Sequence, residues 1–589
     1  MARRDSIMRK PKDVRGSFRR LMKELAPFKK PLIAVFLLCL LSNVLALLGP
    51  SLAGAAINEA AAGKGNVDFD RVTGFALRML FCYVTSSLLS VSINMLMVRL
   101  SKRFAGALRE KVFHKLMTLP VGYFDRNQAG DIISRVSYDI DVISTCMSSD
   151  ITAIMTSVVT VVGSLMMMIV LSPVLALVTV VTVPLAIYYT TWMRKKTQPR
   201  YSKRSRNYGI MNGFVEEMLS GQKSILAYAY EDNVEKDFDE INTNAADAYY
   251  DADYYGCSIG PTVGSINNLG LTLIAVFGAL LYMNGRIQLG QISSFVLYSR
   301  KFSGPINEIA NVINELYSAL AAAERVFALF DETEELHDRQ GARALEGVRG
   351  DVALDHVAFG YEPDRTIIHD LSLKADAGKL VAIVGPTGAG KTTIINLLMR
   401  FYDVDAGKIT VDRTDIRDVT RRSLRACYAM VLQDTWVFRG TIFENIAYGR
   451  EGATMDEVVA AAKAAHIHPF IMRLPKGYET VISEDGGNIS KGQKQLLTIA
   501  RAMLYDARML ILDEATSNVD TSTERAIQRA MRDLMRDKTN FVIAHRLSTI
   551  QHADWILVLE NGDVVEQGTH EELMEKRGAY HRLYAAQFE

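Results

Sequence analysis

The sequence is poor in cysteine and nearly balanced in charge. Only five of its 589 residues are cysteines, and the formal net charge is +1. The cysteines are scattered, without the spacing of a metal site or a disulfide framework, at Cys39, Cys82, Cys146, Cys257 and Cys427. No low-complexity tract or internal repeat is present. Because 589 residues exceed what a single core supports, two or more domains are expected.

Basic residues are concentrated before Pro31, although the chain as a whole is balanced. Taken alone, such a segment could bind nucleic acid or act as a targeting peptide. Asp5 and Asp13 argue against a transit peptide, which is poor in acidic residues. Long apolar stretches follow, so the better interpretation is the cytoplasmic flank of a membrane domain, with no nucleic-acid partner.

Six apolar stretches in the N-terminal half are each close to the roughly 20 residues that a helix needs to cross a lipid bilayer. Clusters of Lys and Arg follow the second and the fourth, which predicts a multi-pass protein of the cell membrane with both termini in the cytoplasm. The predicted spans are Leu32–Gly54, Val72–Val98, Ile151–Leu171, Val174–Trp192, Pro261–Met283 and Ile292–Val312.

The cytoplasmic connections after the second and fourth spans are far longer than ordinary loops. Phe104, Leu108, Val112 and Leu116 recur on one helical face, so the membrane helices are expected to continue into the cytoplasm. The resulting domain plan is a membrane α-helical bundle at 1–330, with a cytoplasmic segment 1–30, six spans within 31–315 and an exit helix to 330. A linker at 331–350 and a cytoplasmic α/β domain at 351–589 follow.

The α/β domain contains a phosphate-binding loop between an apolar strand, Val381–Val384, and a helix, Thr393–Met399. Its glycines let the backbone wrap a phosphate chain, so that N–H groups and a helix N-terminus face the anion. Lys391 would reach the β- and γ-phosphates of ATP or GTP, and the Thr392 hydroxyl would bind Mg²⁺. The expected nucleotide-binding residues are Gly385, Pro386, Thr387, Gly388, Ala389, Gly390, Lys391, Thr392 and Thr393.

Three further polar residues follow apolar strands of this domain. Asp513 ends the run Met509–Asp513 and is placed to hold Mg²⁺, while the next residue, Glu514, would polarise the attacking water. His545 follows the strand Phe541–Ile543. Ligands of open α/β sheets gather at the carboxyl ends of strands, which is where all three residues lie.

These motifs and several others make the region from Val352 onward resemble the nucleotide-binding domain of ABC transporters. The resemblance implies that Tyr361 stacks on adenine and that Gln433 senses Mg²⁺ and the attacking water. It also implies a signature segment and a dimer-crossing loop, which contact the ATP bound to the other subunit through Ser490, Lys491, Gly492, Gln493 and Asp520.

The N-terminal half resembles the membrane domain of type IV ABC exporters, with Tyr123–Asp125 at the start of its first coupling region. One phosphate loop, one signature and one membrane bundle then imply a half-transporter that works as a dimer. Each ATP would lie between the phosphate loop of one chain and the signature of the other, where the helix that begins after Ser490 would stabilise the γ-phosphate.

The signature departs from the family pattern at Ile489 and Lys491. Lys491 replaces a glycine that permits close backbone approach, and it adds a side chain beside phosphate. Since Asp513, Glu514 and His545 are intact, the combination resembles heterodimeric exporters with one competent and one impaired site. A heterodimer with a second half-transporter is therefore favoured, and a homodimer that tolerates the lysine stays open.

Arg300 and Lys301 in the sixth span, with Asn267 and Asn268 in the fifth, are the sequence's only indication of the substrate. They form either a polar wall of a translocation pathway or parts of the cytoplasmic helix extensions. We expect ATP-driven export of hydrophobic or amphiphilic compounds, such as drugs, lipids or peptides. An exporter-shaped importer, for example of siderophores, and a nucleotide-switched membrane protein without transport are the alternatives.

Overall fold

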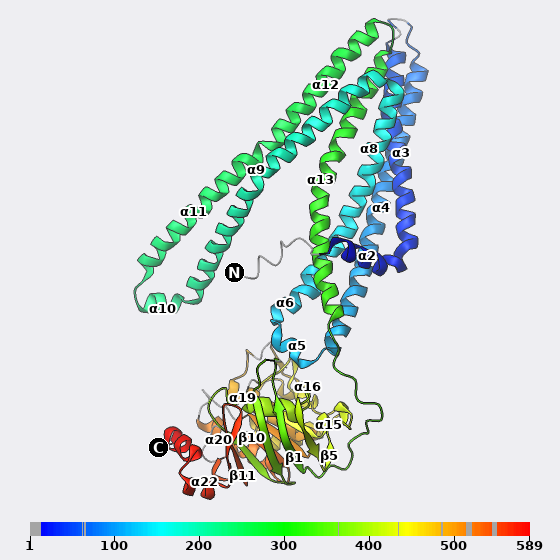
Figure 1. The fold of residues 1–589 in the computed structure, drawn as a ribbon. Coiled ribbons are helices and arrows are strands. Elements are labelled where there is room, and N and C mark those ends of the chain that lie inside the picture. Colours follow the sequence, from blue (N-terminus) through cyan, green and yellow to red (C-terminus); the bar gives the residue numbers. More distant parts are fainter. Residues whose placement is uncertain are drawn as a thin grey trace. The chain divides into compact units, whose positions relative to one another are not determined.

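The computed structural model describes residues 13–61, 63, 66–362, 364–433, 435–483, 487–513, 521–544 and 550–588. The chain divides into two compact units (Figure 1). The first, called the membrane unit, is built from Met1–Leu119 and Asn127–Glu334. The second, called the nucleotide unit, is built from Pro120–Arg126 and Glu335–Glu589, so a seven-residue segment between two membrane-unit helices belongs to it.

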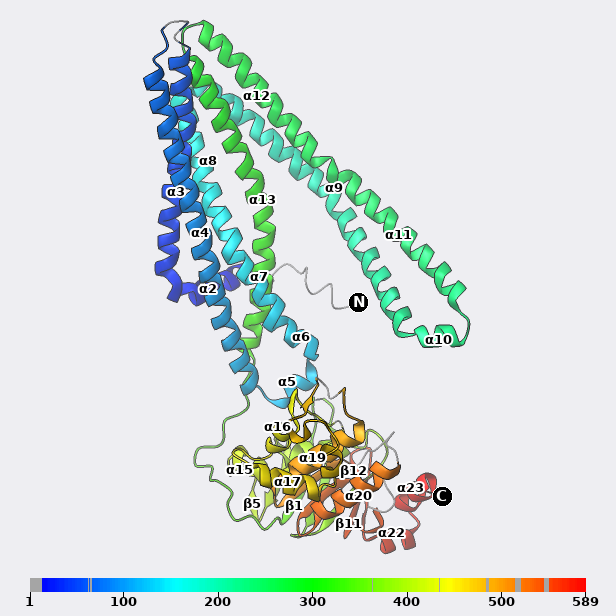
Figure 2. The same ribbon diagram turned by 180° about the vertical axis from the view of Figure 1, so that it is seen from behind.

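The membrane unit is entirely helical within the part that the structure describes. Its long helices fall into two groups in both ribbon views, one containing α3, α4, α8 and α13 and the other containing α9, α11 and α12 (Figures 1 and 2). The long helices are α3 (Lys29–Ala60), α4 (Phe69–Thr118), α8 (Ile151–Leu171), α9 (Pro173–Ser220), α11 (Glu231–Cys257), α12 (Ile259–Met283) and α13 (Leu289–Asp331). Shorter helical segments are α2 (Val14–Leu25), α6 (Ala129–Ser134), α7 (Ile140–Thr145), α10 (Gln222–Ala227) and two π-helical turns, Arg135–Asp139 and Cys146–Asp150.

The predicted helical bundle with long extensions is confirmed, but one predicted span differs from the rest. Five described segments are long and apolar enough to cross a membrane: Val14–Ala60, Phe69–Thr118, Ala129–Leu171, Pro173–Ser220 and Glu231–Met283. The predicted sixth span, Ile292–Val312, lies inside the 43-residue helix α13, which is not among these five. Arg300 and Lys301 interrupt its apolar run and lower its mean hydropathy.

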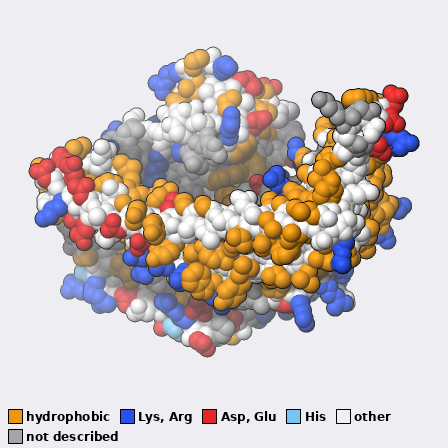
Figure 3. Space-filling view, turned by 90° about the horizontal axis from the view of Figure 1, so that it is seen from above, with side chains coloured by type: hydrophobic (Ala, Val, Ile, Leu, Met, Phe, Trp, Pro, Cys, Tyr) orange, Lys and Arg blue, Asp and Glu red, His pale blue; other side chains and the backbone are white. Residues whose placement is uncertain are grey.

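The outer surface of the long helices is apolar. On α4, for example, Leu80, Phe81 and Leu88 are 58%, 69% and 65% exposed. Figure 3 shows apolar side chains spread over the long helices of this unit. Contiguous exposed apolar surface of this extent is rare on soluble proteins, so these faces are suited to contact lipid.

Helices α3 and α13 are joined at a break in the hydrogen bonding of α3. Pro50 lies inside α3 and has no N–H, so the carbonyl of Ala46 lacks its helical partner. Lys301 Nζ of α13 donates to this carbonyl oxygen at 2.9 Å. Two more α13 side chains donate to carbonyls around the break, Tyr298 to Leu47 at 2.5 Å and Ser294 to Pro50 at 2.7 Å.

The same two helices also come into close backbone contact one turn further along. A Cβ atom on Gly290 would lie 1.9 Å from the carbonyl oxygen of Gly54, so only glycine fits there. Asn58 closes the contact, because its Oδ1 accepts from the Gly290 N–H at 2.7 Å and its Nδ2 donates to Gln288 Oε1 at 2.7 Å. Small residues of this kind allow close helix packing in membranes. This close contact and the hydrogen bond from Lys301 to the Ala46 carbonyl together join α3 to α13.

The nucleotide unit contains a six-stranded sheet in the order β12-β11-β3-β10-β9-β6 and a four-stranded antiparallel sheet in the order β2-β1-β4-β5. Strands β11, β3, β10, β9 and β6 pair in parallel, and β12 pairs antiparallel to β11. The six-stranded sheet comprises β3 (Leu380–Val384), β6 (Tyr428–Val431), β9 (Met509–Asp513), β10 (Thr539–Ile543), β11 (Trp555–Glu560) and β12 (Asp563–Gly568). The antiparallel sheet comprises β1 (Val352–Phe359), β2 (Ile368–Ala375), β4 (Ala406–Val411) and β5 (Thr414–Asp415).

Helices surround the six-stranded sheet, whose inner strands β3, β9 and β10 are almost completely buried, as expected for parallel strands covered on both faces. The main helices are α14 (Lys391–Leu398), α16 (Ile442–Ala447), α17 (Met455–Ala464), α19 (Lys491–Tyr505), α20 (Thr521–Met535), α22 (His570–Lys576) and α23 (Ala579–Phe588). Short segments are α5 (Val121–Arg126), α15 (Arg421–Ala426), α18 (His468–Ile471), β7 (Gly440–Thr441) and β8 (Val481–Ile482).

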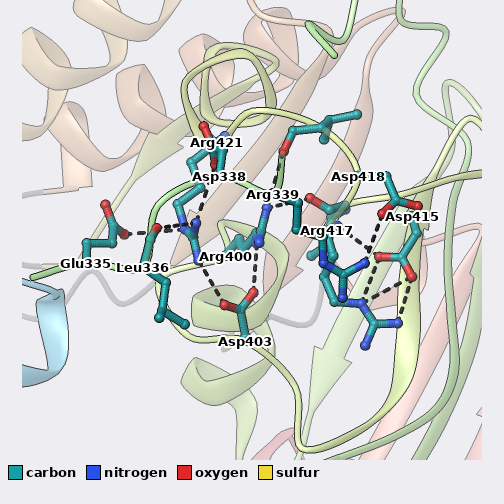
Figure 4. A network of polar contacts seen from close by, with 12 residues as sticks. Glu335, Leu336, Asp338, Arg339, Arg400, Asp403, Asp415, Arg417, Asp418 and Arg421 are labelled. Atoms are coloured by element: carbon teal, nitrogen blue, oxygen red, sulfur yellow. Dashed lines mark hydrogen bonds and ion pairs between the residues drawn. The ribbon is translucent and has the colours of Figure 1, made fainter. Parts of the chain in front are cut away.

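The segment after α13 is fixed to the nucleotide unit by an arginine cluster (Figure 4). Arg421 is 7% exposed, and its guanidinium donates to the carbonyl of Leu336 at 2.7 Å and to Asp403 at 2.8 Å. Arg425 pairs with Glu335 at 2.5 Å. Residues 332–351 contain no helix or strand, yet their first part is held by charge-assisted hydrogen bonds.

Candidate nucleotide-binding site

The loop between β3 and α14 has a backbone that requires glycine. Gly385, Gly388 and Gly390 have φ angles of +153°, +85° and +99°. A Cβ atom on Gly385 would lie 2.2 Å from the carbonyl oxygen of Leu559 on the neighbouring strand. Side chains are thus excluded from one wall of the loop, and its backbone opens toward the N-terminus of α14. Such an arrangement binds phosphate through N–H groups and the helix dipole.

Lys391, the first residue of α14, reaches back over this loop. Its Nζ donates to the carbonyl oxygens of Gly385 at 2.7 Å and Pro386 at 2.8 Å. Burial lowers the pKa of Lys391 from its usual value, and the negative charge of Asp513 partly opposes this effect. The ammonium is therefore held where a polyphosphate on the loop would meet it, and Asp513 is close enough to influence it.

Strand pairing places the predicted acidic and amide groups at the same edge of the sheet. Ile543 of β10 lies beside Ile383 of β3 and Asp513 of β9, so these strands end together. Gln433 is exposed two residues after β6, the neighbour of β9. Thr392 is exposed on the first turn of α14, while Thr387 is exposed in the loop and Ala389 is buried. Hydroxyl, carboxylate and amide oxygens are the donors that Mg²⁺ prefers, so Thr392, Asp513 and Gln433 fit this ion chemically.

Tyr361 follows β1 and lies against the helix that begins after the phosphate loop. Its hydroxyl donates to Thr393 Oγ1 at 3.3 Å and accepts from Asn396 Nδ2 at 3.0 Å. Thr393 is 5% exposed, whereas Tyr361 is 42% exposed. The structure thus brings an accessible aromatic ring next to α14, as base stacking beside the phosphate loop requires.

The signature residues form the start of α19. Ser490 caps the helix: its hydroxyl accepts from the Gln493 N–H at 3.3 Å, and its own N–H donates to Gln493 Oε1 at 2.8 Å. Lys491 is the first helical residue and is exposed, whereas Gly492 is buried. Lys491 does not have a positive φ, so the backbone at this position accepts a side chain. Any effect of the lysine must come from its side chain, which extends from a helix N-terminus.

Three predicted site residues, Glu514, His545 and Asp520, lie outside the described residues. Their predicted roles stay predictions. Described strands lead directly to two of these positions, because β9 ends at Asp513 and the residue after β10, Ala544, is described and buried.

Sequence reasoning did not single out Tyr402, which lies in the same aromatic cluster as Tyr361. Its hydroxyl donates to Asp125 Oδ2 of α5 at 2.5 Å. The two residues are 277 positions apart, so no local pattern indicates this bond. The nearest signal in the sequence is the assignment of Tyr123–Asp125 to a coupling region, which predicts a contact with the nucleotide domain without naming its partner.

Comparison with known proteins agrees with both units. Residues 32–306 match the family model of the ABC transporter transmembrane region, and residues 368–517 match that of the ABC transporter. The uncharacterized ABC transporter ATP-binding protein YfiC of Bacillus subtilis (strain 168) is 42% identical over 583 residues, covering 98% of this chain and 96% of the relative. This chain belongs to the ABC transporter family.

Two further similarities concern the type of transporter. A fatty acid ABC transporter ATP-binding/permease protein of Mycobacterium bovis is 41% identical over 621 residues, covering 98% of this chain and 97% of the relative. The solved structure of a bacterial Atm1-family ABC exporter with ATP bound has a TM-score of 0.75 and 31% identity, covering 96% of this chain and 99% of the other.

The transporter therefore has the half-transporter architecture of type IV exporters, and the predicted resemblance is confirmed. Its nucleotide unit is an ABC ATPase domain that binds ATP and couples ATP hydrolysis to transport across a membrane. Similarity to exporters favours export over the importer and switch alternatives. Half-transporters of this family typically act as dimers.

Proposed function

We propose that the transporter is one half of a dimeric exporter that moves hydrophobic or amphiphilic compounds across the cytoplasmic membrane, with both termini in the cytoplasm. The observation that carries this proposal is the union, in one chain, of helices with apolar outer faces and an ATPase sheet edge bearing Lys391 and Asp513. The named substrate class of the Mycobacterium bovis relative, fatty acids, supports an amphiphilic substrate.

Each proposed catalytic residue has a different role in ATP hydrolysis. Lys391 binds and orients the β- and γ-phosphates, and Gln433 orients the attacking water. Glu514 accepts a proton from this water, and His545 contacts the γ-phosphate. Thr392 and Asp513, with Gln433, would hold Mg²⁺, which neutralises charge on the phosphate oxygens.

The second contact to each ATP comes from the other subunit. Ser490, Gly492, Gln493 and Asp520 of one chain face the nucleotide on the phosphate loop of its partner. The N-terminus of α19 supplies N–H groups and a favourable dipole for the γ-phosphate. ATP then holds the two nucleotide units together, and hydrolysis weakens that contact. Transport follows from the different affinity of the closed and open states for nucleotide.

Lys491 favours a heterodimer over a homodimer. It is exposed at the helix N-terminus that would face the partner's ATP. Its side chain adds bulk and charge beside the phosphates at the site that this chain's signature completes. This chain's own Asp513, Glu514 and His545 would serve the other site, together with an intact signature from a second half-transporter.

The structure gives Lys301 of the sixth helix, α13, a role in helix packing that does not involve substrate. Lys301 is bonded to the Ala46 carbonyl of α3, so its ammonium already has a partner that compensates for its burial. Arg300, next to it, is exposed. An anionic substrate is therefore not required to explain the lysine, and the wider class of hydrophobic and amphiphilic compounds stays as proposed.

The catalytic proposal is tested by Glu514→Gln in the assembled transporter, reconstituted in lipid vesicles. We expect ATP hydrolysis to fall by about 100-fold or more, because the general base is lost, while ATP-dependent closure persists. Glu451→Gln, which changes an exposed carboxylate of the same unit, is the matched control. Normal turnover in the Glu514 variant would contradict the assignment. ATP-dependent uptake into inside-out vesicles tests the direction of transport.

A further inference from the structure

The short helix α5 (Val121–Arg126) packs with the nucleotide unit through one tyrosine. Tyr402 Oη donates to Asp125 Oδ2 at 2.5 Å. A Cβ atom on Gly122 would lie 2.9 Å from Tyr402 Cε1, so the ring also rests against the backbone of α5. Tyr402 thus fixes α5 by a directed bond at Asp125 and by close packing at Gly122.

The same tyrosine ring contacts the aromatic residue expected to bind adenine. The ring centroids of Tyr361 and Tyr402 are 5.0 Å apart with an interplanar angle of 86°, an edge-to-face pair. Phe359 contacts both rings, at 5.0 Å from Tyr361 and 5.5 Å from Tyr402. Tyr361 in turn bonds to Thr393 and Asn396 of α14. A continuous chain of contacts therefore runs from α5 to the helix that follows the phosphate loop.

In the hydrogen bond between Tyr402 and Asp125, the Tyr402 hydroxyl keeps its proton when the pH changes within the neutral range. Burial raises the pKa of the Tyr402 phenol above its usual value, and the hydrogen bond and negative charge of Asp125 raise it further. The phenol therefore stays protonated and remains the donor throughout the neutral range. Asp125 supplies the acceptor, so removal of either partner breaks the same bond.

We propose that Tyr402 is a positioning residue that connects α5 to the base-binding side of the nucleotide site. Its bond to Asp125 holds the ring against which Tyr361 packs, so Tyr361 and α5 shift together. This inference rests on the proposed function, in which Tyr361 stacks on adenine. It adds that α5 responds to the base of the nucleotide as well as to the phosphates. By thermodynamic linkage, if adenine binding stabilises the position of α5, then α5 in that position strengthens adenine binding by the same free energy.

The test compares a ligand that has the base with one that lacks it. The full-length assembled transporter carries Glu514→Gln to prevent hydrolysis, and it is titrated with Mg-ATP and with Mg-tripolyphosphate. Tyr402→Phe keeps the ring and removes the hydroxyl. We expect it to weaken ATP binding by about fivefold, equivalent to about 1 kcal/mol, and to leave tripolyphosphate binding unchanged. Tyr478→Phe is the matched control, because it removes a hydroxyl bonded to His468 at 2.7 Å elsewhere in the unit.

A second variant removes the other partner. Asp125→Ala should weaken ATP binding by the same factor, and the double variant should weaken it no further, because both changes break one bond. If both single variants bound ATP with wild-type affinity, the proposed function would be unaffected and this inference would be overturned. Equal losses for ATP and tripolyphosphate would also overturn it, because they indicate general disruption of the site. Failure of the unmodified transporter to bind ATP would overturn the proposed function and this inference together.

Discussion

At the scale of single residues, Lys391 carries the clearest electrostatic signature of the site. It is bonded to two carbonyls of its own loop and is partly buried there. Because burial lowers its pKa and Asp513 offsets this effect only in part, its ammonium is easier to deprotonate than that of a surface lysine. Bound phosphate would stabilise the ammonium and raise the pKa again.

ATP affinity should therefore fall as pH rises through the lowered pKa of free Lys391. Below that pKa the lysine is already charged and ATP binding takes up no proton at this side chain. Above it, binding must add a proton, which costs free energy that grows with pH. Calorimetric titrations between about pH 7 and about pH 10, in buffers of different ionisation enthalpy, measure both the affinity and the proton uptake.

The control for this pH dependence is Lys391→Arg. A guanidinium stays charged over the whole range, so the uptake of a proton at this position should disappear even if the affinity changes. An identical pH profile in the two proteins would show that another group is responsible.

At the scale of secondary structure, the contact between α3 and α13 depends on a proline. Pro50 frees the carbonyl of Ala46, and Lys301 binds it. Lys301→Met should therefore destabilise the membrane unit by about 1–3 kcal/mol, because it leaves a half-buried acceptor without a donor. Thermal unfolding in lipid nanodiscs measures the change, and Arg300→Met, at an exposed neighbouring position, should alter stability by less than about 0.5 kcal/mol.

Combining the variant with Pro50→Ala separates this bond from general packing. Alanine restores the N–H that a regular helix offers to the Ala46 carbonyl. In the Pro50→Ala background, the cost of Lys301→Met should shrink markedly. Strictly additive losses would mean that the lysine stabilises the bundle in some other way.

How far the elements could be read from the sequence depends on the range of the interactions that define them. Hydropathy alone gives the third span with the same bounds as α8, Ile151–Leu171, and the phosphate loop follows β3 as expected. Both are local signals. The partner of Lys301 is 255 residues away, and that of Tyr402 is 277 residues away, so neither pairing leaves a trace in any short window. The sixth span, Ile292–Val312, is predicted within α13, although Arg300 and Lys301 lower its hydropathy and α13 is not among the five described segments that are apolar enough to cross a membrane.

At the scale of the whole molecule, Lys491 bears on how two half-transporters assemble. In a homodimer both sites would face this side chain. We therefore expect the chain purified alone to hydrolyse ATP slowly, and Lys491→Gly to raise that rate by about tenfold, equivalent to about 1.4 kcal/mol. Steady-state ATPase assays in lipid measure it.

Lys491→Ala serves as the graded comparison, since it removes the charge and keeps a better helix former than glycine. It should recover much of the gain, because the backbone there is already helical with a lysine present. Rapid turnover by the unmodified chain on its own would instead favour a homodimer in which the lysine is tolerated.

The exposure of the cysteines allows the movement of the two chains to be followed with a fluorescent label. Cys257, at the end of α11, is exposed, while Cys39, Cys82 and Cys146 are buried and Cys427 is half-buried. Because maleimide reagents need an accessible sulfur, a fluorescent dye would attach first at Cys257. If two copies of this chain form a homodimer, one dye at the α11–α12 junction of each copy would report a single interchain separation during the ATP cycle, without prior removal of the other four cysteines.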